Sequence, residues 1–151
     1  MPSLSLASPL GSLTLVEEQG ALVSLAFGGT RGHDASPLLR RARAQLLEYF
    51  AGRRREFALP LAPHGTPFQQ ALWDALLAIP YGELRTYGEL AAALESAPRA
   101  IGGACGRNPI PIIIPCHRVV AAGSLGGYSG GQGLATKRKL LALERSDPFA
   151  G

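Results

Sequence analysis

The first third of the chain carries apolar residues in short segments that are separated by turn residues. In the first segment Leu4 and Leu6 fall on one face, which is the period of a half-buried strand. Gly11-Ser12 and Gln19-Gly20 are typical turn pairs. The pattern therefore predicts a small sheet built from three strands: residues 3–7, 13–17 and 21–27.

A helical period follows a polar stretch that runs from Gly28 to Ser36. Ser36-Pro37 provides a capping side chain and a proline at the first helical position. Gly52 ends the predicted helix, and the three arginines at 53–55 are expected to be exposed. The apolar stripe that this helix would bury consists of Leu39, Ala42, Leu46 and Phe50.

Residues 59–65 contain two prolines and a glycine, which predicts a linker between two domains. We place an N-terminal α/β domain at residues 1–62 and a C-terminal domain at residues 63–151. Thr66-Pro67 begins the first helix of the second domain with the same capping chemistry. Its predicted stripe is Phe68, Leu72, Ala75 or Leu76, and Ile79.

Two short helical segments come next. Thr86 can cap a helix that runs through Leu94, and Ala97-Pro98 begins another that ends near Arg107. The three-residue link between them is typical of a helix-turn-helix. The predicted fold class is thus α+β, with a small N-terminal sheet domain that includes a helix and a mainly helical C-terminal domain that contains the helix-turn-helix.

The last third of the chain has three further segments. The β-branched run 110–114 is expected to be buried, although the prolines around it make it a poor ladder strand. Residues 123–133 hold six glycines and predict a loop, and residues 134–145 predict a final helix. The glycines are not followed by Gly-Lys-Ser/Thr, so they do not indicate a phosphate-binding loop.

Composition narrows the class of protein. No apolar run is long enough to cross a bilayer, and the N-terminus does not look like a signal peptide, so we expect a soluble, cytoplasmic chain with no membrane partner. The net charge of +4, carried mostly by arginine, suits a polyanion such as DNA but is weak support by itself. Two cysteines and three scattered histidines predict no metal site and no disulfide framework.

The sharpest local feature is Cys116, which follows an apolar run and precedes His117 and Arg118. Positive charge beside a thiol favours the thiolate and lowers the pKa of the cysteine below its free value of about 8.5. A thiolate is the soft nucleophile that attacks carbon. Neighbouring residues of an extended chain point to opposite faces, so a water molecule is the expected link between Cys116 and His117.

Glu144 is a candidate for the group that orients His117. On a helix it falls on the apolar side marked by Leu140 and Leu141, where a carboxylate needs a partner. The alternative is a glutamate at the helix end that tilts into solvent. Spacing alone does not separate the two readings, just as a small buried thiol remains the alternative for Cys116.

These residues belong to a longer pattern. The stretch from Thr66 to Glu144 resembles the catalytic domain of the O6-alkylguanine-DNA (methylated-DNA–protein-cysteine) alkyltransferases. The matching words are TPFQQALWDALLAIPYGELRTYGELA, PRAIGGACGRNPIPIIIPCHRVV, GSLGGYSGG and KRKLLALE, in the expected order. The resemblance implies a DNA repair protein that moves an alkyl group from O6-alkylguanine, with O4-alkylthymine as a possible second lesion, onto its own cysteine in a single turnover.

The resemblance also implies roles for individual residues. Cys116 matches the alkyl acceptor, His117 the water-linked base, and Glu144 the carboxylate that polarises it. Asn108 matches the residue that holds the turn before the active-site segment. Tyr87 matches the donor to the leaving guanine, and Arg99 the finger that fills the gap left by a flipped nucleotide.

Further matches concern the DNA surface. Tyr128 and Ser129 match the pair that lines the base pocket. Pro98, Ala100 and Gly102 match compact positions of a recognition helix that approaches the minor groove of double-stranded DNA. The resemblance implies no cofactor, a monomer, and an association with the nucleoid when the chain is on DNA. Cys105, in the same helix, is expected to pack and to have no chemical role.

The sequence departs from the family pattern in three places. The turn at residues 95–97 is about two residues shorter than in many members, Gln132-Gly133 looks inserted, and the zinc ligands of some members are not evident. Three other functions stay open: a non-catalytic alkylguanine-binding protein, a helix-turn-helix transcription regulator, and a cysteine hydrolase.

Overall fold

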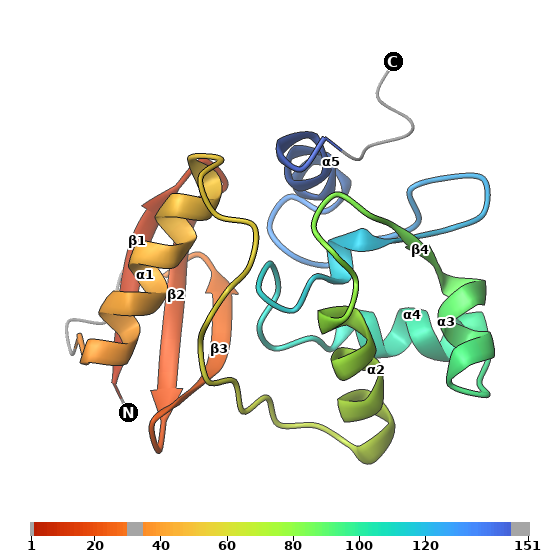
Figure 1. Cartoon of the computed structure of the whole chain (residues 1–151), viewed down its shortest axis with the longest axis horizontal. Helices are drawn as coiled ribbons and strands as arrows, with labels where there is room; N and C mark the ends of the chain where they lie inside the picture. Colours follow the sequence, from red (N-terminus) through yellow and green to blue (C-terminus); the bar gives the residue numbers. More distant parts are fainter. Residues whose placement is uncertain (1, 30–34, 146–151) are drawn as a thin grey trace. The chain divides into compact units, whose positions relative to one another are not determined.

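The computed structural model describes residues 2–29 and 35–145. The chain divides into two compact units, unit 1 at residues 1–64 and unit 2 at residues 65–151 (Figure 1). The division falls two residues after the boundary that the proline-rich segment predicted. Part of the predicted polar stretch, residues 30–34, lies outside the described residues. No helix in the described ranges is long and apolar enough to cross a membrane.

Unit 1 is a three-stranded antiparallel sheet with one helix packed against it (Figure 1). The strands are β1 (Ser3–Ser8), β2 (Gly11–Glu18) and β3 (Ala21–Phe27), in the order β1-β2-β3. The predicted turn at Gly11-Ser12 was wrong by two residues, since the chain turns at Pro9-Leu10 and Gly11 already begins β2. The Ser8 hydroxyl closes this turn by accepting from Leu10 N and donating to Gly11 O.

Helix α1 (Pro37–Phe50) begins at Ser36, whose side chain accepts a hydrogen bond from Leu39 N. The predicted stripe was wrong at Phe50, which is only half-buried, whereas Tyr49 is fully buried. The Tyr49 ring packs against Phe57, 5.4 Å away between centroids, so the chain beyond the helix selects which of the two rings faces the core. Gln45 is buried as well, and its amide holds both backbone groups of Ala58.

The segment predicted as a linker is partly built into unit 1. Leu22 N donates to Pro60 O at 2.9 Å, and Ala62 N donates to Leu22 O at 2.9 Å. These two bonds add a short parallel bridge to the edge of β3. Residues 60–62 therefore belong to the sheet edge, although Pro60 and Pro63 prevent a longer strand.

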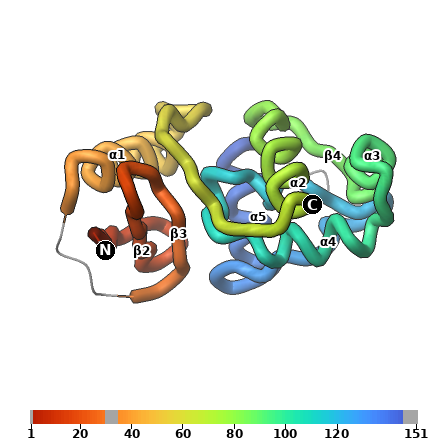
Figure 2. The backbone as a smooth tube through the Cα atoms, turned by 90° about the horizontal axis from the view of Figure 1, so that it is seen from below, coloured from red at the N-terminus to blue at the C-terminus, as the bar shows by residue number. Residues whose placement is uncertain are grey.

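Unit 2 is mainly helical. Its elements are α2 (Pro67–Leu77), β4 (Arg85–Thr86), α3 (Tyr87–Ala93), α4 (Pro98–Gly106), a 3-10 turn η1 (Cys116–Arg118), β5 (Val119–Val120) and α5 (Leu134–Leu143). Figure 2 follows the backbone through these elements. Capping boxes begin α2 and α3, with Thr66 paired to Gln69 and Thr86 to Glu89. Helices α3 and α4 pack together as the predicted helix-turn-helix.

The core of unit 2 centres on Trp73, which the predicted stripe of α2 did not include. Its indole is buried, and Nε1 donates to Ala104 O at 3.2 Å. This bond ties α2 to the last turn of α4. Leu72, Leu76 and Ile79 are buried as well, which settles the choice between Ala75 and Leu76 in favour of Leu76. The predicted stripe was wrong at Phe68, which is only half-buried.

The run 110–114 enters the core without forming a strand of a sheet. Ile110, Ile112, Ile113 and Ile114 are all buried. Ile112 has φ +75°, a left-handed conformation that β-branched residues rarely adopt. The surrounding packing and the bond from Ile114 N to Ile110 O hold this conformation. The run leads into η1, and β5 then pairs in parallel with β4.

Candidate active site

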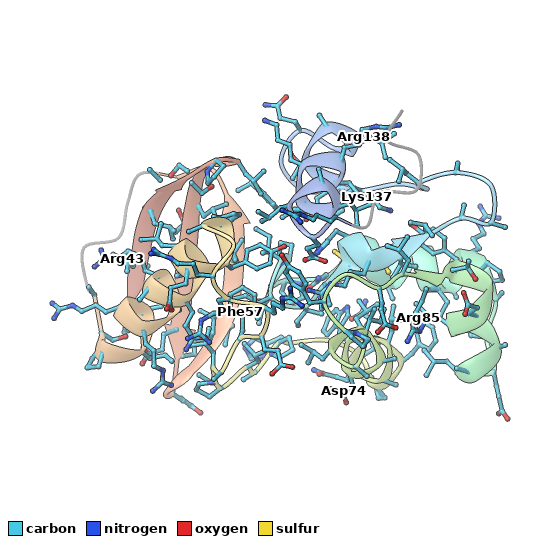
Figure 3. The ribbon with its side chains drawn as sticks, turned by 45° about the horizontal axis from the view of Figure 1, so that its top comes forward. Arg43, Phe57, Asp74, Arg85, Lys137 and Arg138 are labelled. Carbon is cyan, nitrogen blue, oxygen red and sulfur yellow. The ribbon has the colours of Figure 1, made fainter. Side chains whose placement is uncertain are left out.

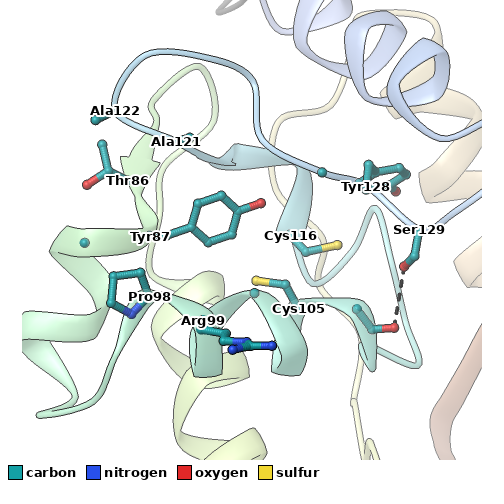
Figure 4. Close-up of a pocket in the computed structure, with 14 residues that line it drawn as sticks. Thr86, Tyr87, Pro98, Arg99, Cys105, Cys116, Ala121, Ala122, Tyr128 and Ser129 are labelled. Atoms are coloured by element: carbon teal, nitrogen blue, oxygen red, sulfur yellow. Dashed lines mark hydrogen bonds between the residues drawn. The ribbon is translucent and has the colours of Figure 1, made fainter.

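A cavity of about 800 Å³ lies in unit 2, and Cys116 forms part of its wall (Figure 4). Predicted site residues that line it are Tyr87, Pro98, Arg99, Gly102, Cys116, Tyr128 and Ser129. Other lining residues are Thr86, Gly88, Cys105, Gly106, Ala121, Ala122 and Gly127. Asn108, His117 and Glu144 lie outside this wall, and Ala100 is exposed elsewhere on α4.

The 3-10 turn η1 sends three consecutive side chains in different directions. Such a turn has three residues per revolution, so neighbouring side chains diverge by about 120°. Cys116 faces the cavity, whereas His117 and Arg118 both bond to Glu144 in the interior.

Glu144 accepts hydrogen bonds from His117 and Arg118 in the core of unit 2. Its Oε2 lies 2.8 Å from His117 Nε2, and Arg118 Nε and Nη2 donate to its two oxygens at 2.9 and 3.0 Å. Arg118 Nη1 donates to Ile79 O at 2.7 Å. The Glu144 side chain is fully buried just beyond the end of α5, so the solvent-tilted alternative was wrong.

The charges of this network follow from its contacts. Burial alone would raise the pKa of Glu144, but hydrogen bonds from His117 and Arg118 outweigh it and lower the pKa to about 2. Burial lowers the pKa of His117 against the opposing pull of Glu144. The carboxylate is therefore ionised and the imidazole neutral near neutral pH.

The expected lowering of the Cys116 pKa by neighbouring positive charge was wrong. The Arg118 guanidinium forms an ion pair with Glu144, so it is not a source of positive charge for the Cys116 thiol. Burial raises the pKa of Cys116, while the side-chain amide of Asn108 and the charge of Lys137 lower it in part. The thiol is thus protonated at rest, and a base is needed to make it a nucleophile.

Asn108 joins the end of α4 to the active-site segment. Its Nδ2 donates to Ile114 O at 2.8 Å, and its Oδ1 accepts from Ile110 N at 2.9 Å. The two bonds close the bend over residues 108–114. Because Ile114 lies two residues before Cys116, this bend fixes where η1 begins.

Tyr87 stands at the start of α3 with its ring in the cavity wall (Figure 4). The ring lies between two glycines: a Cβ on Gly126 would come within 2.7 Å of it, and one on Gly102 within 4.0 Å. Burial raises the pKa of Tyr87, with a further rise from Cys105, so its hydroxyl stays protonated and can donate.

Lys137 is the functional candidate that the sequence did not reveal. Its side chain is fully buried, and Nζ donates to the carbonyls of Val119, Leu125 and Gly127 at 2.6, 2.5 and 3.0 Å. Burial lowers the pKa of Lys137 to about 8, although both cysteines oppose the shift. The ammonium thus ties β5 to the loop that carries Tyr128.

The remaining wall residues come from α4 and the glycine-rich loop. Arg99 and Pro98 are exposed at the start of α4, where Arg99 borders the cavity (Figure 4). Ser129 Oγ is 3.5 Å from Gly106 O, and the Tyr128 hydroxyl is buried without a hydrogen-bond partner among the described residues. Burial raises the pKa of Tyr128, so that hydroxyl remains protonated.

Cys105 has a more prominent place than packing alone would give it. It lines the cavity together with Cys116, and both sulfur atoms face the same space (Figure 4). Burial raises the pKa of Cys105 to about 12, with a further contribution from Cys116. The Cys105 thiol therefore stays protonated and is a poor nucleophile, although it lies in the same cavity wall as Cys116. Within residues 2–29 and 35–145, no group of three or more His, Cys, Asp and Glu side chains could hold a metal ion.

Sequence comparison places both units in one family. The sequence model of the 6-O-methylguanine DNA methyltransferase DNA binding domain matches residues 67–146. That of the 6-O-methylguanine DNA methyltransferase ribonuclease-like domain matches residues 4–63. The chain belongs to the 6-O-methylguanine DNA methyltransferase family. Unit 2 is accordingly the DNA-binding domain of a methyltransferase.

Similar members of the family come from several bacteria. The constitutive methylated-DNA–protein-cysteine methyltransferase of Bacillus subtilis is 44% identical, over 91% of this chain and 92% of that protein. The methylated-DNA–protein-cysteine methyltransferase of Mycobacterium bovis is 47% identical, over 92% of this chain and 89% of that protein.

A solved structure of the family agrees with the fold over almost the whole chain. The crystal structure of Mycobacterium tuberculosis OGT in complex with DNA has a TM-score of 0.86 and 46% identity to this chain. The match covers 97% of this chain and 94% of that one. The α+β class, with an N-terminal sheet domain and a helical C-terminal domain, is confirmed.

Proposed function

We propose that this chain is a DNA repair protein that transfers the alkyl group of O6-alkylguanine in DNA irreversibly to the sulfur of Cys116. The observation that carries the proposal is the position of Cys116 in the wall of a cavity of about 800 Å³, next in sequence to a buried His117–Glu144 pair. Family membership supplies the reaction class.

The first step is removal of the thiol proton. His117 Nε2 donates to the Glu144 carboxylate, so in the neutral ring Nδ1 is the acceptor. Nδ1 is buried, and none of the described residues bonds to it. We assign His117 Nδ1 as the acceptor of the Cys116 thiol proton, which reaches it through one water molecule. Glu144 then stabilises the imidazolium that forms.

The second step is displacement at carbon. The thiolate sulfur forms a bond to the alkyl carbon as the bond from that carbon to O6 breaks and its electron pair passes to the guanine. Tyr87 donates a hydrogen bond to the departing guanine anion. That anion takes up one proton from water, and the His117 imidazolium returns to water the proton that it received from Cys116, so the protons balance. The product is a thioether on Cys116. A thioether is stable in water, so each chain reacts once and no cofactor is required.

Access to the base requires nucleotide flipping, because the alkyl carbon is enclosed in a stacked duplex. Arg99 borders the cavity and fills the space left in the stack. Tyr128 and Ser129 hold the flipped base. The compact residues Pro98, Ala100 and Gly102 let α4 approach the minor groove, and one monomer suffices for all of these contacts.

Mass spectrometry tests the proposal directly. The full chain is incubated with an equal amount of duplex that contains one O6-methylguanine, then digested and mapped. We expect one methyl group on the peptide of Cys116, none on Cys105, and no second turnover when DNA is in excess. Cys116→Ala is expected to acquire no methyl group, and Cys105→Ala to react like the parent chain.

Two results would contradict the proposal. Repeated turnover would indicate a hydrolase, and binding of alkylated DNA with no transfer would indicate a lesion-binding protein. A duplex with O4-methylthymine in the same position tests the second lesion, because it presents the same type of alkyl–oxygen bond.

A further inference from the structure

The positive charge of this chain is concentrated in one stretch of unit 1. Residues 37–55 hold six of the fifteen lysines and arginines but one of the eleven acidic residues. This stretch therefore carries +5, and all other residues together carry −1, against a net charge of +4. The charge that attracts a polyanion thus comes mainly from α1 and the turn that follows it.

Four of these arginines form what we call the arginine surface: Arg40, Arg41, Arg43 and Arg53. Arg40 and Arg41 are exposed on α1, away from the buried stripe of Leu39, Ala42 and Leu46. Arg43 lies one turn after Arg40 and is partly exposed (Figure 3). Arg53 is exposed just after the helix ends.

In the part of the chain that the structure describes, the arginine surface has no paired carboxylate. Among the described residues no carboxylate lies within 4 Å of these four guanidinium groups. Glu48, the one acidic residue of the stretch, pairs with Arg54 at 3.1 Å instead. Like charges one helical turn apart repel each other, which costs a few tenths of a kcal/mol per pair. An external polyanion would remove that repulsion.

The DNA-binding unit supplies little net charge of its own. Residues 65–151 contain eight basic and six acidic residues. Arg118, Lys137 and Glu144 are buried, which leaves six basic against five acidic residues in the rest of the unit. Non-specific affinity for duplex DNA depends on the number of phosphates that Lys and Arg neutralise. The net charge of the DNA-binding unit alone therefore attracts a polyanion only weakly.

We propose that the arginine surface of α1 binds the phosphate backbone of duplex DNA and forms a second contact in addition to the helix-turn-helix. The proposal rests on the proposed function, because it takes DNA as the polyanion. Guanidinium groups suit this role, since they bind phosphate through two parallel hydrogen bonds. Such contacts read no sequence and set affinity and salt dependence.

The test uses the full chain with Arg40, Arg41 and Arg53 changed together to Gln. Binding to an unmodified duplex is measured at several salt concentrations. We expect weaker binding and a smaller slope of log affinity against log salt, by about 0.9 for each lost phosphate contact and by about 2.7 for three. The matched variant with Lys at the same three positions is expected to keep the slope of the parent chain.

A second readout separates this proposal from the proposed function. Alkylation of Cys116 by free benzylguanine needs no DNA, so the Gln variant is expected to react at the parent rate. An unchanged salt slope in the Gln variant would overturn the arginine surface as a DNA contact and point to an acidic protein partner. Failure of the parent chain to react with benzylguanine would overturn the proposed function and leave the salt measurement intact.

If the triple variant does not fold, the single variant Arg53→Gln serves instead, because Arg53 lies outside the helix. A reduction of the slope by about 0.9 would support the contact, and an unchanged slope would oppose it.

Discussion

The Oε2 atom of Glu144 lies 2.8 Å from Nε2 of His117 in the interior of unit 2, and both side chains are fully buried. Arg118 shares the same carboxylate, so one acidic group balances a guanidinium and orients an imidazole. The three side chains depend on one another, because removal of Glu144 or Arg118 leaves a buried charge without its partner.

Glu144→Gln is expected to reduce both stability and alkyl transfer. The Arg118 charge would stay buried without a counter-charge, which costs about 3–5 kcal/mol in the free energy of unfolding. Urea denaturation measures the loss. Glu83→Gln is the matched control, since the Glu83–Arg85 pair is solvent-exposed and worth less than about 1 kcal/mol. Equal effects of the two changes would contradict the account.

Acid is expected to destabilise the fold in two stages. The pKa of His117 is below its usual 6.5 in the folded chain, so stability is lost as the pH falls below that value. The pKa of Glu144 falls from 4.5 to about 2, so a second loss sets in below 4.5 and continues to about 2. Urea unfolding between about pH 7 and pH 4 measures the first stage and the start of the second. A stability that rises on acidification would contradict both shifts.

Gly126→Ala is expected to slow alkylation of Cys116 by benzylguanine. The added Cβ would lie 2.7 Å from the Tyr87 ring, at a φ of +73° that alanine disfavours. Displacement of the ring by a fraction of an ångström would slow transfer by roughly tenfold or more. Gly123→Ala is the control, because nothing lies within 4 Å of its Cβ, and it is expected to react at the parent rate.

Lys137→Met is expected to destabilise unit 2. The carbonyls of Val119, Leu125 and Gly127 would lose their shared donor, at about 1–3 kcal/mol for each acceptor left unsatisfied. Thermal or urea unfolding measures the loss. Lys139→Met changes an exposed lysine of the same helix and is expected to leave stability within about 0.5 kcal/mol. A similar stability for both variants would show that the three bonds contribute little.

Arg99→Ala is expected to separate the reaction on DNA from the reaction on a free base. Without the side chain, the gap left by a flipped nucleotide stays open, and transfer from duplex DNA slows by roughly tenfold or more. The rate with free benzylguanine is expected to stay unchanged. Arg99 is exposed at the border of the cavity, and the proposed reaction gives it no part in the bond-forming or bond-breaking step. Equal losses on both substrates would assign Arg99 a role in the pocket instead.

Local signals in the sequence were sufficient for the helices of both units. Ser36, Thr66 and Thr86 each cap the helix that was predicted after them, since capping involves residues only three positions apart. The helix-turn-helix followed from the Thr86 cap of α3 and from Pro98 at the start of α4, which has no side-chain cap. The ends were also close, with α4 finishing at Gly106 where Arg107 was expected.

The network behind the cavity could not be predicted in the same way. A lysine on a helix normally lies at the surface, and only the folded backbone reveals the three carbonyls that bury Lys137. Arg118 was expected to serve Cys116 because they are close in sequence. The 3-10 turn directs it to Glu144 instead, and the backbone angles that decide this depend on packing of the run 110–114.

The bond between the indole of Trp73 and Ala104 O has a practical consequence for following the protein in solution. The chain contains a single tryptophan, and it lies in unit 2 beneath α4. Its fluorescence therefore reports melting of the helix-turn-helix side alone, while the buried Tyr49 belongs to the other unit. Tyr81, Tyr87 and Tyr128 lie in unit 2 as well, so the useful partner signal is the far-ultraviolet circular dichroism of both units. Comparing it with tryptophan fluorescence in one label-free sample reveals whether the halves lose their structure together or one after the other.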